Sequence, residues 1–109
     1  MLSIIIPLRN EIENIDNIKE SFYKNLVDIK YEVIFINDFS TDGTLQKANE
    51  IAKENQNFKV FNNRIRGLGG AINLGIEKCS GKYICITMAD LSDDFEDLKR
   101  YYFKISKEN

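Results

Sequence analysis

Residues 33–52 read VIFINDFSTDGTLQKANEIA, and this segment gives the clearest indication of the fold class. It opens with a β-branched and aromatic run, which is typical of a buried strand over Glu32 to Asn37. The polar cluster from Asp38 to Gly43 has turn and N-cap chemistry, and the apolar positions after it recur at helical spacing. Those apolar residues are Leu45, Ala48, Ile51 and Ala52. The stretch therefore predicts one strand that leads directly into one helix.

The residues before this unit repeat the same order. Leu2 to Pro7 is rich in Ile and stops at the only proline, which cannot donate a backbone hydrogen bond, so it predicts a buried strand. From Glu11 onward apolar residues recur every three or four positions, and Asn10 is placed to cap the first turn. The apolar residues of this predicted helix are Ile12, Ile15, Ile18, Phe22, Leu26 and Ile29.

Two further strand-then-helix units follow. Lys59 to Phe61 predicts a short strand, and the glycine-rich residues Gly67 to Gly70 open a helix after it. We expect Gly81 to end that helix as a left-handed C-terminal residue. Tyr83 to Met88 predicts the fourth strand, and Ser92 is placed to cap a final helix.

Four such units in succession predict an α/β fold. Each connection is long enough to hold a helix, so the strands run parallel and the crossovers are right-handed. We expect a three-layer α/β/α arrangement of the Rossmann-like kind, with a mainly parallel sheet. A chain of 109 residues holds one core, so residues 1–109 form a single domain.

The composition excludes several classes of function. A formal charge of -2 offers no basic surface for nucleic acid, and we expect no nucleic-acid partner. No His is present, which removes Ser/His and Cys/His nucleophile systems and a Cys/His zinc site. Cys79 and Cys85 are expected to be buried thiols in a reducing cytoplasm. No apolar run approaches the roughly 20 residues of a membrane span, so we expect a cytoplasmic protein.

Acidic residues follow two of the predicted strands. Ligands of open parallel sheets bind outside the carboxyl ends of the strands, and Asp38 and Asp90 lie at such ends. We expect neighbouring strands to bring these two carboxylates side by side, where they suit a ribose or a divalent cation with its phosphates. The alternative is that each only caps the helix behind it. Asp93 and Asp94 are assigned to a solvated face, or they reach a metal held by Asp90.

The loop before the third helix carries phosphate-binding chemistry. The segment GLGGA, from Gly67 to Ala71, allows close approach of backbone to a ligand and offers a helix N-terminus. It matches neither the dinucleotide fingerprint nor the Walker A pattern. Arg64 and Arg66 are candidates for a diphosphate clamp, because no carboxylate lies beside them in the sequence. The alternative is that both are ordinary surface residues.

Four segments together resemble the amino-terminal half of family 2 glycosyltransferases with the GT-A fold. Within that family the resemblance is to the dolichol-phosphate mannose synthase and polyprenyl-phosphate glycosyltransferase group. The segments are SIIIPLRNEIENI (residues 3–15), VIFINDFSTDGT (33–44), GLGGAINLGIEKCSGKYI (67–84) and MADLSDDFEDL (88–98). They occur in the family's order and spacing, which makes the resemblance specific.

The resemblance implies a hexosyltransferase that moves a sugar from UDP or GDP to an acceptor, with inversion and with Mg²⁺ or Mn²⁺. The acceptor would be a polyprenyl phosphate or a glycan, and a lipid acceptor implies a place at the inner face of a membrane. Asp38 would contact base or ribose, and Asp90 would be the metal ligand. The expected donor-binding residues are Pro7, Leu8, Arg9, Asn10, Glu11, Ile36, Asp38, Arg64, Arg66, Gly67, Met88 and Ala89.

Three features depart from the family pattern. Met88 stands where the family's Asp-x-Asp metal motif has its first carboxylate, and Arg9 stands where an aromatic residue often lies against the base. The half of the family fold that supplies the acceptor site has no counterpart after Asn109. We therefore expect a truncated domain that binds the donor but is inactive alone, and a homodimer through the apolar edge left by the missing half.

Two other classes of protein share this size and fold class. A receiver-like interaction module needs an acidic pair directly after the first strand, where only Glu11 comes near. A nucleotidyltransferase that forms sugar nucleotides needs a glycine-rich loop at that place, and this chain has Pro7-Leu8-Arg9-Asn10 there. The receiver-like module remains the alternative to a transferase.

Overall fold

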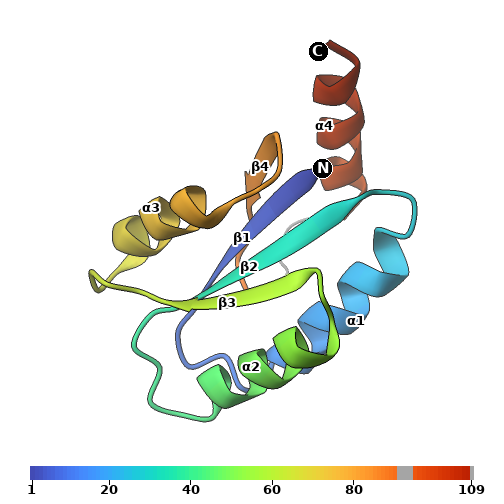
Figure 1. The fold of residues 1–109 in the computed structure, drawn as a ribbon. Coiled ribbons are helices and arrows are strands. Elements are labelled where there is room, and N and C mark those ends of the chain that lie inside the picture. The colour runs from blue at the N-terminus through green and yellow to red at the C-terminus, as the bar shows by residue number, and fades with distance from the viewer. Residues whose placement is uncertain (91–94, 109) are drawn as a thin grey trace.

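Within residues 1–90 and 95–108, which a computed structural model describes, four parallel strands lie in the order β3-β2-β1-β4 (Figure 1). The strands are β1 (Leu2–Leu8), β2 (Tyr31–Asn37), β3 (Phe58–Asn62) and β4 (Tyr83–Ile86). The helices are α1 (Ile15–Asn25), α2 (Thr44–Glu54), α3 (Leu68–Lys78) and α4 (Phe95–Glu108). The predicted alternation of strand and helix and the parallel sheet are confirmed.

Helices cover both faces of the sheet, which gives the three predicted layers (Figure 1). On one face, side chains of β1 and β2 pack against α1, α2 and α4. On the other face, Ile5, Ile34 and Ile36 pack against Ala71 and Leu74 of α3. All seven residues of β1 are buried, because this strand is central and is covered on both faces.

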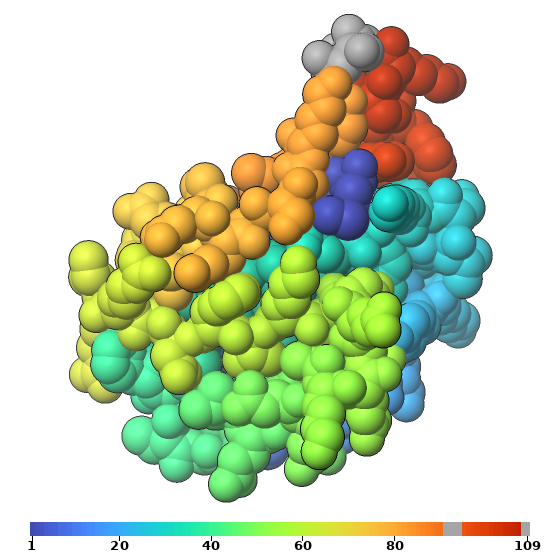
Figure 2. Space-filling model, in the orientation of Figure 1, coloured from blue at the N-terminus to red at the C-terminus, as the bar shows by residue number. Residues whose placement is uncertain are grey.

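Helix α4 extends beyond the body that the other elements form (red in Figure 2). It is joined to the core at its start, where the ring of Phe95 meets that of Phe22 edge-on at 5.2 Å between centroids. Leu98 and Tyr102 pack against the same core cluster. Ser92, the expected cap of this helix, lies outside the described residues, as do Asp93 and Asp94. No helix in the described part of the chain is both long and apolar enough to cross a membrane.

Two predicted helix boundaries are wrong. Helix α1 begins at Ile15 rather than Glu11, because Asn10 adopts a left-handed φ of 54° and its side chain bonds to another loop. Helix α3 ends at Lys78, followed by an extended Cys79, and Gly81 does not take a positive φ. Gly81 is required for a different reason: a Cβ there would lie 2.5 Å from Ser3 Oγ.

A buried carboxylate holds three strands and a turn together at the amino edge of the sheet. Glu32 of β2 is 2% exposed, and its carboxylate accepts hydrogen bonds from the Ser3 hydroxyl of β1 at 2.5 Å and the Ser80 N–H at 2.6 Å. The Lys59 ammonium of β3 donates to it at 2.8 Å. The Ser3 hydroxyl also accepts the Gly81 N–H at 2.8 Å. This network fixes the turn between α3 and β4 against the sheet.

The pKa of the Glu32 carboxyl predicts how stability depends on pH. Burial alone would raise this pKa, but the hydrogen bonds from Lys59, Ser3 and Ser80 and the Lys59 charge bring it below its ordinary value. The folded pKa is therefore lower than the unfolded one, and the unfolded state binds the proton first. The contribution is fully present above the unfolded pKa of a glutamate, about 4.3, and is lost as the pH falls through the lower, folded pKa.

We expect the free energy of unfolding to fall in acid, and Glu32→Gln to make that fall shallower. Urea unfolding at a series of pH values from about 3 to 7 measures both profiles. Parallel profiles for the two proteins would show that Glu32 does not contribute to acid sensitivity.

Candidate functional site

The carboxyl edge of the sheet gathers the polar residues that follow the strands. The Asp38 N–H after β2 donates to the Leu8 carbonyl of β1 at 2.7 Å. The Asn63 N–H after β3 donates to the Asn37 carbonyl of β2 at 2.9 Å. The hydrogen bonding from β2 to β1 and from β3 to β2 thus continues for one residue beyond the ends of β2 and β3. The loops that follow them start from one rigid edge.

Asp38 anchors the loop between β3 and α3. Its side chain is 6% exposed, and its carboxylate accepts the Asn63 side-chain N–H at 3.0 Å and the Gly67 N–H at 3.0 and 3.2 Å. Gly67 has a φ of 111°, which side chains other than hydrogen rarely allow. Asp38 therefore does not cap the helix behind it, α2. It fixes the start of α3, which lies after a different strand.

The Asp38 carboxyl is held in its anionic form. Burial alone would raise its pKa, but the hydrogen bonds from Gly67 and Asn63 and the charges of Arg9 and Arg66 bring the pKa below its ordinary value. Both arginines are exposed, whereas Asp38 is buried. At neutral pH this edge therefore holds one buried negative charge with two accessible positive charges near it.

Asn63 is a residue of this site that the sequence did not predict. It is 7% exposed, and its side-chain amide donates both to Asp38 and, at 3.2 Å, to the Gly67 carbonyl. The Ile65 N–H donates to its carbonyl oxygen at 3.4 Å. The available signal was its position, because it directly follows the strand that neighbours β2. Its amide orients the Asp38 carboxylate and the loop together.

The loop after β1 is fastened to the loop after β2. The Asn10 side-chain carbonyl accepts the N–H groups of Thr41 and Asp42 at 2.8 and 3.3 Å, and the Glu11 N–H donates to Thr44 Oγ1 at 2.8 Å. The Asn10 N–H donates to Ser40 Oγ at 3.0 Å. These bonds join segments about 30 residues apart in sequence, so the two loops form one unit.

Several of the expected donor-binding residues lie inside the sheet. Pro7 is buried, and Leu8 and Ile36 have no exposed surface, because their side chains belong to the core clusters on the two faces. Only their backbone is at the carboxyl edge. Glu11 is half-buried and accepts the side-chain N–H of Asn14 at 2.9 Å. Arg9 is exposed at this edge.

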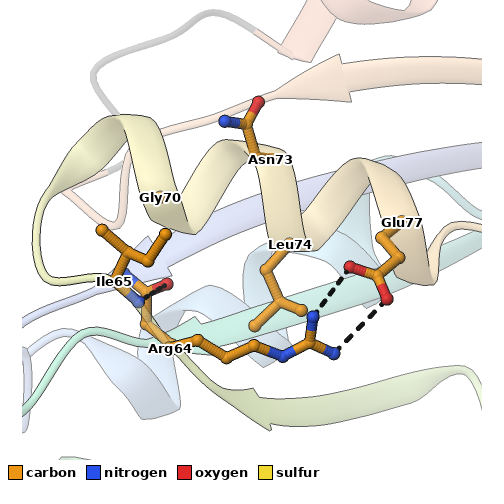
Figure 3. Close-up of a pocket in the computed structure, with 7 residues that line it drawn as sticks. Arg64, Ile65, Gly70, Asn73, Leu74 and Glu77 are labelled. Atoms are coloured by element: carbon orange, nitrogen blue, oxygen red, sulfur yellow. Dashed lines mark hydrogen bonds and ion pairs between the residues drawn. The ribbon is translucent and has the colours of Figure 1, made fainter.

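Arg64 and Arg66 have different surroundings although they belong to one loop. Two guanidinium N–H groups of Arg64 donate to the Glu77 carboxylate of α3 at 3.1 and 3.3 Å (Figure 3). No carboxylate lies beside Arg64 in the sequence, but the fold brings Glu77 to it. The guanidinium of Arg66 instead lies over the ring of Phe39, at 5.4 Å from the centroid.

A small pocket lies between the loop after β3 and the outer side of α3. Its volume is about 200 Å³, and the Arg64–Glu77 pair spans one side of it (Figure 3). Its lining residues are Asn63, Arg64, Ile65, Gly70, Asn73, Leu74 and Glu77. It adjoins the Asp38 anchor through Asn63, but Arg64 within it is directed toward Glu77.

The end of β4 flanks β1 on the side opposite to β2. The Thr87 N–H donates to the Ile5 carbonyl at 3.0 Å, Ala89 is 3% exposed in the core, and Met88 and Asp90 are exposed. Because β1 lies between β2 and β4, the expectation that neighbouring strands place Asp38 and Asp90 side by side is wrong. The two carboxylates follow strands that end at the same edge but are separated by β1.

The described residues fit a divalent cation only as an open site. No three His, Cys, Asp or Glu side chains gather within the described part of the chain. The Asp38 oxygens are bonded to Asn63 and Gly67, and the exposed Asp90 lies on the other side of β1. Mg²⁺ binds in this way in many proteins, through one or two carboxylates with substrate phosphates and water.

Two glycosyltransferases are similar to this chain in sequence. The chain is 33% identical over 117 residues to the dolichyl-phosphate beta-glucosyltransferase of Saccharomyces cerevisiae, covering 97% of this chain and 34% of that protein. It is 30% identical over 90 residues to the dolichol-phosphate mannosyltransferase of Pyrococcus furiosus, covering 83% and 26%. The chain thus spans about a third or less of the length of these relatives.

A solved structure and a family model point the same way. The fold matches the mannosyltransferase PcManGT from Pyrobaculum calidifontis in complex with GDP-Man and Mn²⁺, with a TM-score of 0.66 and 28% identity. The match covers 89% of this chain and 30% of that one. The model of glycosyl transferase family 2 matches residues 3–109. On its sequence and its GT-A fold, the chain belongs to glycosyl transferase family 2.

Proposed function

We propose that this chain forms the donor site of a glycosyltransferase that binds a UDP- or GDP-sugar with Mg²⁺ or Mn²⁺. The reaction it serves is transfer with inversion to an acceptor such as a polyprenyl phosphate or a glycan. The observation that carries this proposal is the buried, anionic Asp38 with Arg9 and Arg66 near it at the carboxyl edge. The Mn²⁺ and GDP-Man complex of a relative supports it. Family membership argues against the receiver-like alternative.

Asp38 retains the capacity to accept a hydrogen bond from the donor. A carboxylate offers about four acceptor positions. Oδ1 of Asp38 accepts from the Asn63 side chain and from the Gly67 N–H, both at 3.0 Å. Oδ2 accepts only from the same Gly67 N–H, at 3.2 Å. A base N–H or a ribose hydroxyl is the ligand group that suits this oxygen. Because Asp38 is fixed by two protein donors, little ordering accompanies binding.

The two arginines supply the positive charge that a diphosphate requires. A guanidinium presents several N–H donors in a planar fork that matches phosphate oxygens. Arg66 and Arg9 are exposed near Asp38, whereas Arg64 is paired with Glu77. We therefore assign the diphosphate to Arg66, with Arg9 beside the base, and we remove Arg64 from the donor-binding set.

Asp90 is the residue that would hold the cation. A bound divalent cation neutralises the charge that develops on the diphosphate as the sugar departs. Asp90 would position it against the phosphates, with water at the remaining positions. A lipid phosphate acceptor is already an anion, which suits a chain without His.

Calorimetric titration with UDP and with GDP, each in the presence and absence of Mn²⁺, tests this proposal. We expect one of the two nucleotides to bind, and Mn²⁺ to tighten that binding by about tenfold or more. Asp90→Asn should remove the effect of Mn²⁺ and leave metal-free binding of the nucleotide in place.

A second carboxylate provides the control for this experiment. Asp16 of α1 is 63% exposed and pairs with Lys47 across a surface helix contact, so Asp16→Asn should keep the full effect of Mn²⁺. Absence of heat with both nucleotides at millimolar concentration would refute the donor site. If Asp90→Asn and Asp16→Asn depend equally on Mn²⁺, only the assignment of Asp90 as the metal ligand is refuted, and the donor site stands.

A further inference from the structure

Phe39 has a costly backbone conformation at the carboxyl edge. It directly follows Asp38 and has a φ of 57°, in the left-handed region. For a bulky side chain this conformation costs about 1–2 kcal/mol. The side chain is also 44% exposed, so its burial in the core does not compensate for that cost. Costly conformations of this kind concentrate at functional sites.

The ring of Phe39 supports one particular charged group. The Arg66 guanidinium lies over it at 5.4 Å from the centroid, within the range of a cation–π interaction. The two residues come from different loops, after β2 and before α3. In the part of the chain that the structure describes, no carboxylate forms an ion pair with Arg66. The aromatic face therefore contacts a guanidinium that is not neutralised by an ion pair within those residues.

The backbone of Arg66 is fixed from the other side. The next residue, Gly67, donates its N–H to Asp38, and the carbonyl of Gly67 accepts from Asn63. An unrestrained arginine loses about 2 kcal/mol of side-chain entropy when it is ordered. Here the backbone is held by Asp38 and the guanidinium by Phe39, so much of that cost is met before any ligand arrives.

We propose that Phe39 is a positioning residue that holds the Arg66 guanidinium ready for the diphosphate of the donor. This assignment rests on the proposed function, because the diphosphate is the group that Arg66 meets. It gives Phe39 a role in affinity for an anionic ligand although the phenyl ring itself carries no charge. Arg64 in the same loop is restrained differently, by the Glu77 carboxylate, which neutralises it.

Leucine and tyrosine substitutions at Phe39 distinguish the effect of the aromatic ring from the effect of side-chain size. With UDP or GDP and Mn²⁺ as the probe, calorimetry should show that Phe39→Leu weakens binding about 2- to 5-fold, the equivalent of an exposed cation–π interaction. Phe39→Tyr keeps a ring and should retain the original affinity within about twofold. In an Arg66→Met background, Phe39→Leu should cause no further loss, because it acts through that guanidinium.

Phe61 provides a matched control. Its ring lies under the Lys78 ammonium at 5.2 Å, so Phe61→Leu removes a similar contact on the α3 side of the sheet. We expect that variant to keep the affinity for the nucleotide. A loss of affinity from Phe39→Leu that persists undiminished in the Arg66→Met background would overturn the proposal, because it would show a role independent of Arg66.

A measurement without ligand keeps the assignment testable by itself. In the free chain, the Arg66 Hδ resonances should lie upfield because of the Phe39 ring, and Phe39→Leu should return them to ordinary values. Unchanged resonances would overturn the contact. If the unsubstituted chain binds neither nucleotide, the donor site and this assignment both fail. If it binds and Phe39→Leu binds equally well, only the assignment of Phe39 fails.

Discussion

Replacing Glu32 with alanine is expected to lower the free energy of unfolding by about 3 kcal/mol. Hydrogen bonds to charged groups contribute about 1.5–3 kcal/mol each, and alanine would leave the Ser80 N–H and the Ser3 hydroxyl without this acceptor. Lys59 adds less, because its side chain is 42% exposed and remains solvated. The loss therefore comes mainly from the buried donors.

Denaturant unfolding followed by circular dichroism measures this change. Glu20 of α1 provides the matched control, because it is exposed and Glu20→Ala should change stability by no more than about 0.5 kcal/mol. We expect the loss of stability in Glu32→Gln to lie between those of Glu32→Ala and Glu20→Ala, since the glutamine amide keeps one acceptor oxygen. An equal, small effect of Glu32→Ala and Glu20→Ala would contradict a stabilising role for the network.

Gly70→Ala is also expected to lower the free energy of unfolding by about 3 kcal/mol. A Cβ at this position would lie 2.1 Å from the Ile65 carbonyl oxygen and 3.0 Å from its carbonyl carbon. Both are backbone atoms, so no side-chain rotation relieves the clash. Either the first turn of α3 or the loop that carries Arg66 has to move.

The neighbouring Gly69 gives an unusually close control. A Cβ there would meet nothing within 4 Å, and alanine is favoured over glycine inside a helix by about 0.5–1 kcal/mol. Gly69→Ala should therefore stabilise the protein slightly while Gly70→Ala destabilises it strongly. Thermal unfolding of the two variants compares them directly. A shift in the same direction for both would contradict the close packing of Ile65 against α3.

Much of the fold could be predicted because its signals are local. The Ile-rich run of β1 and the β-branched run of β2 have no competing interpretation, and each predicted strand overlaps the observed one. Helix α2 follows from the spacing of Ala48 and Ile51 after a turn sequence. The carboxyl edge was also predictable, since parallel strands place their ends together.

The parts that were predicted wrongly depend on contacts between distant residues. Asn10 was expected to cap a helix, but its side chain serves Thr41 and Asp42, which are about 30 residues away. Arg64 pairs with Glu77, which lies thirteen residues later in the sequence, in the helix that follows the loop of Arg64. Secondary-structure propensities and the spacing of apolar residues contain no information about such pairs. They form only when the folded sheet brings the loops together.

The Glu32 network and the Asp38 anchor lie at opposite ends of the sheet, so one end can be changed without disturbing the other. Glu32 lies near the start of β2 and Asp38 directly follows its end, so one carboxylate secures the amino end of the sheet and the other secures the loop before α3 at the carboxyl end. Under the proposed function, we expect substitutions in residues 9–11, 39–43 or 64–66 to change which nucleotide is preferred, while the Glu32 network keeps the far end of the sheet assembled. Randomising those loops while Ser3, Glu32 and Gly81 are kept is therefore the design route to a new specificity that the proposed function suggests.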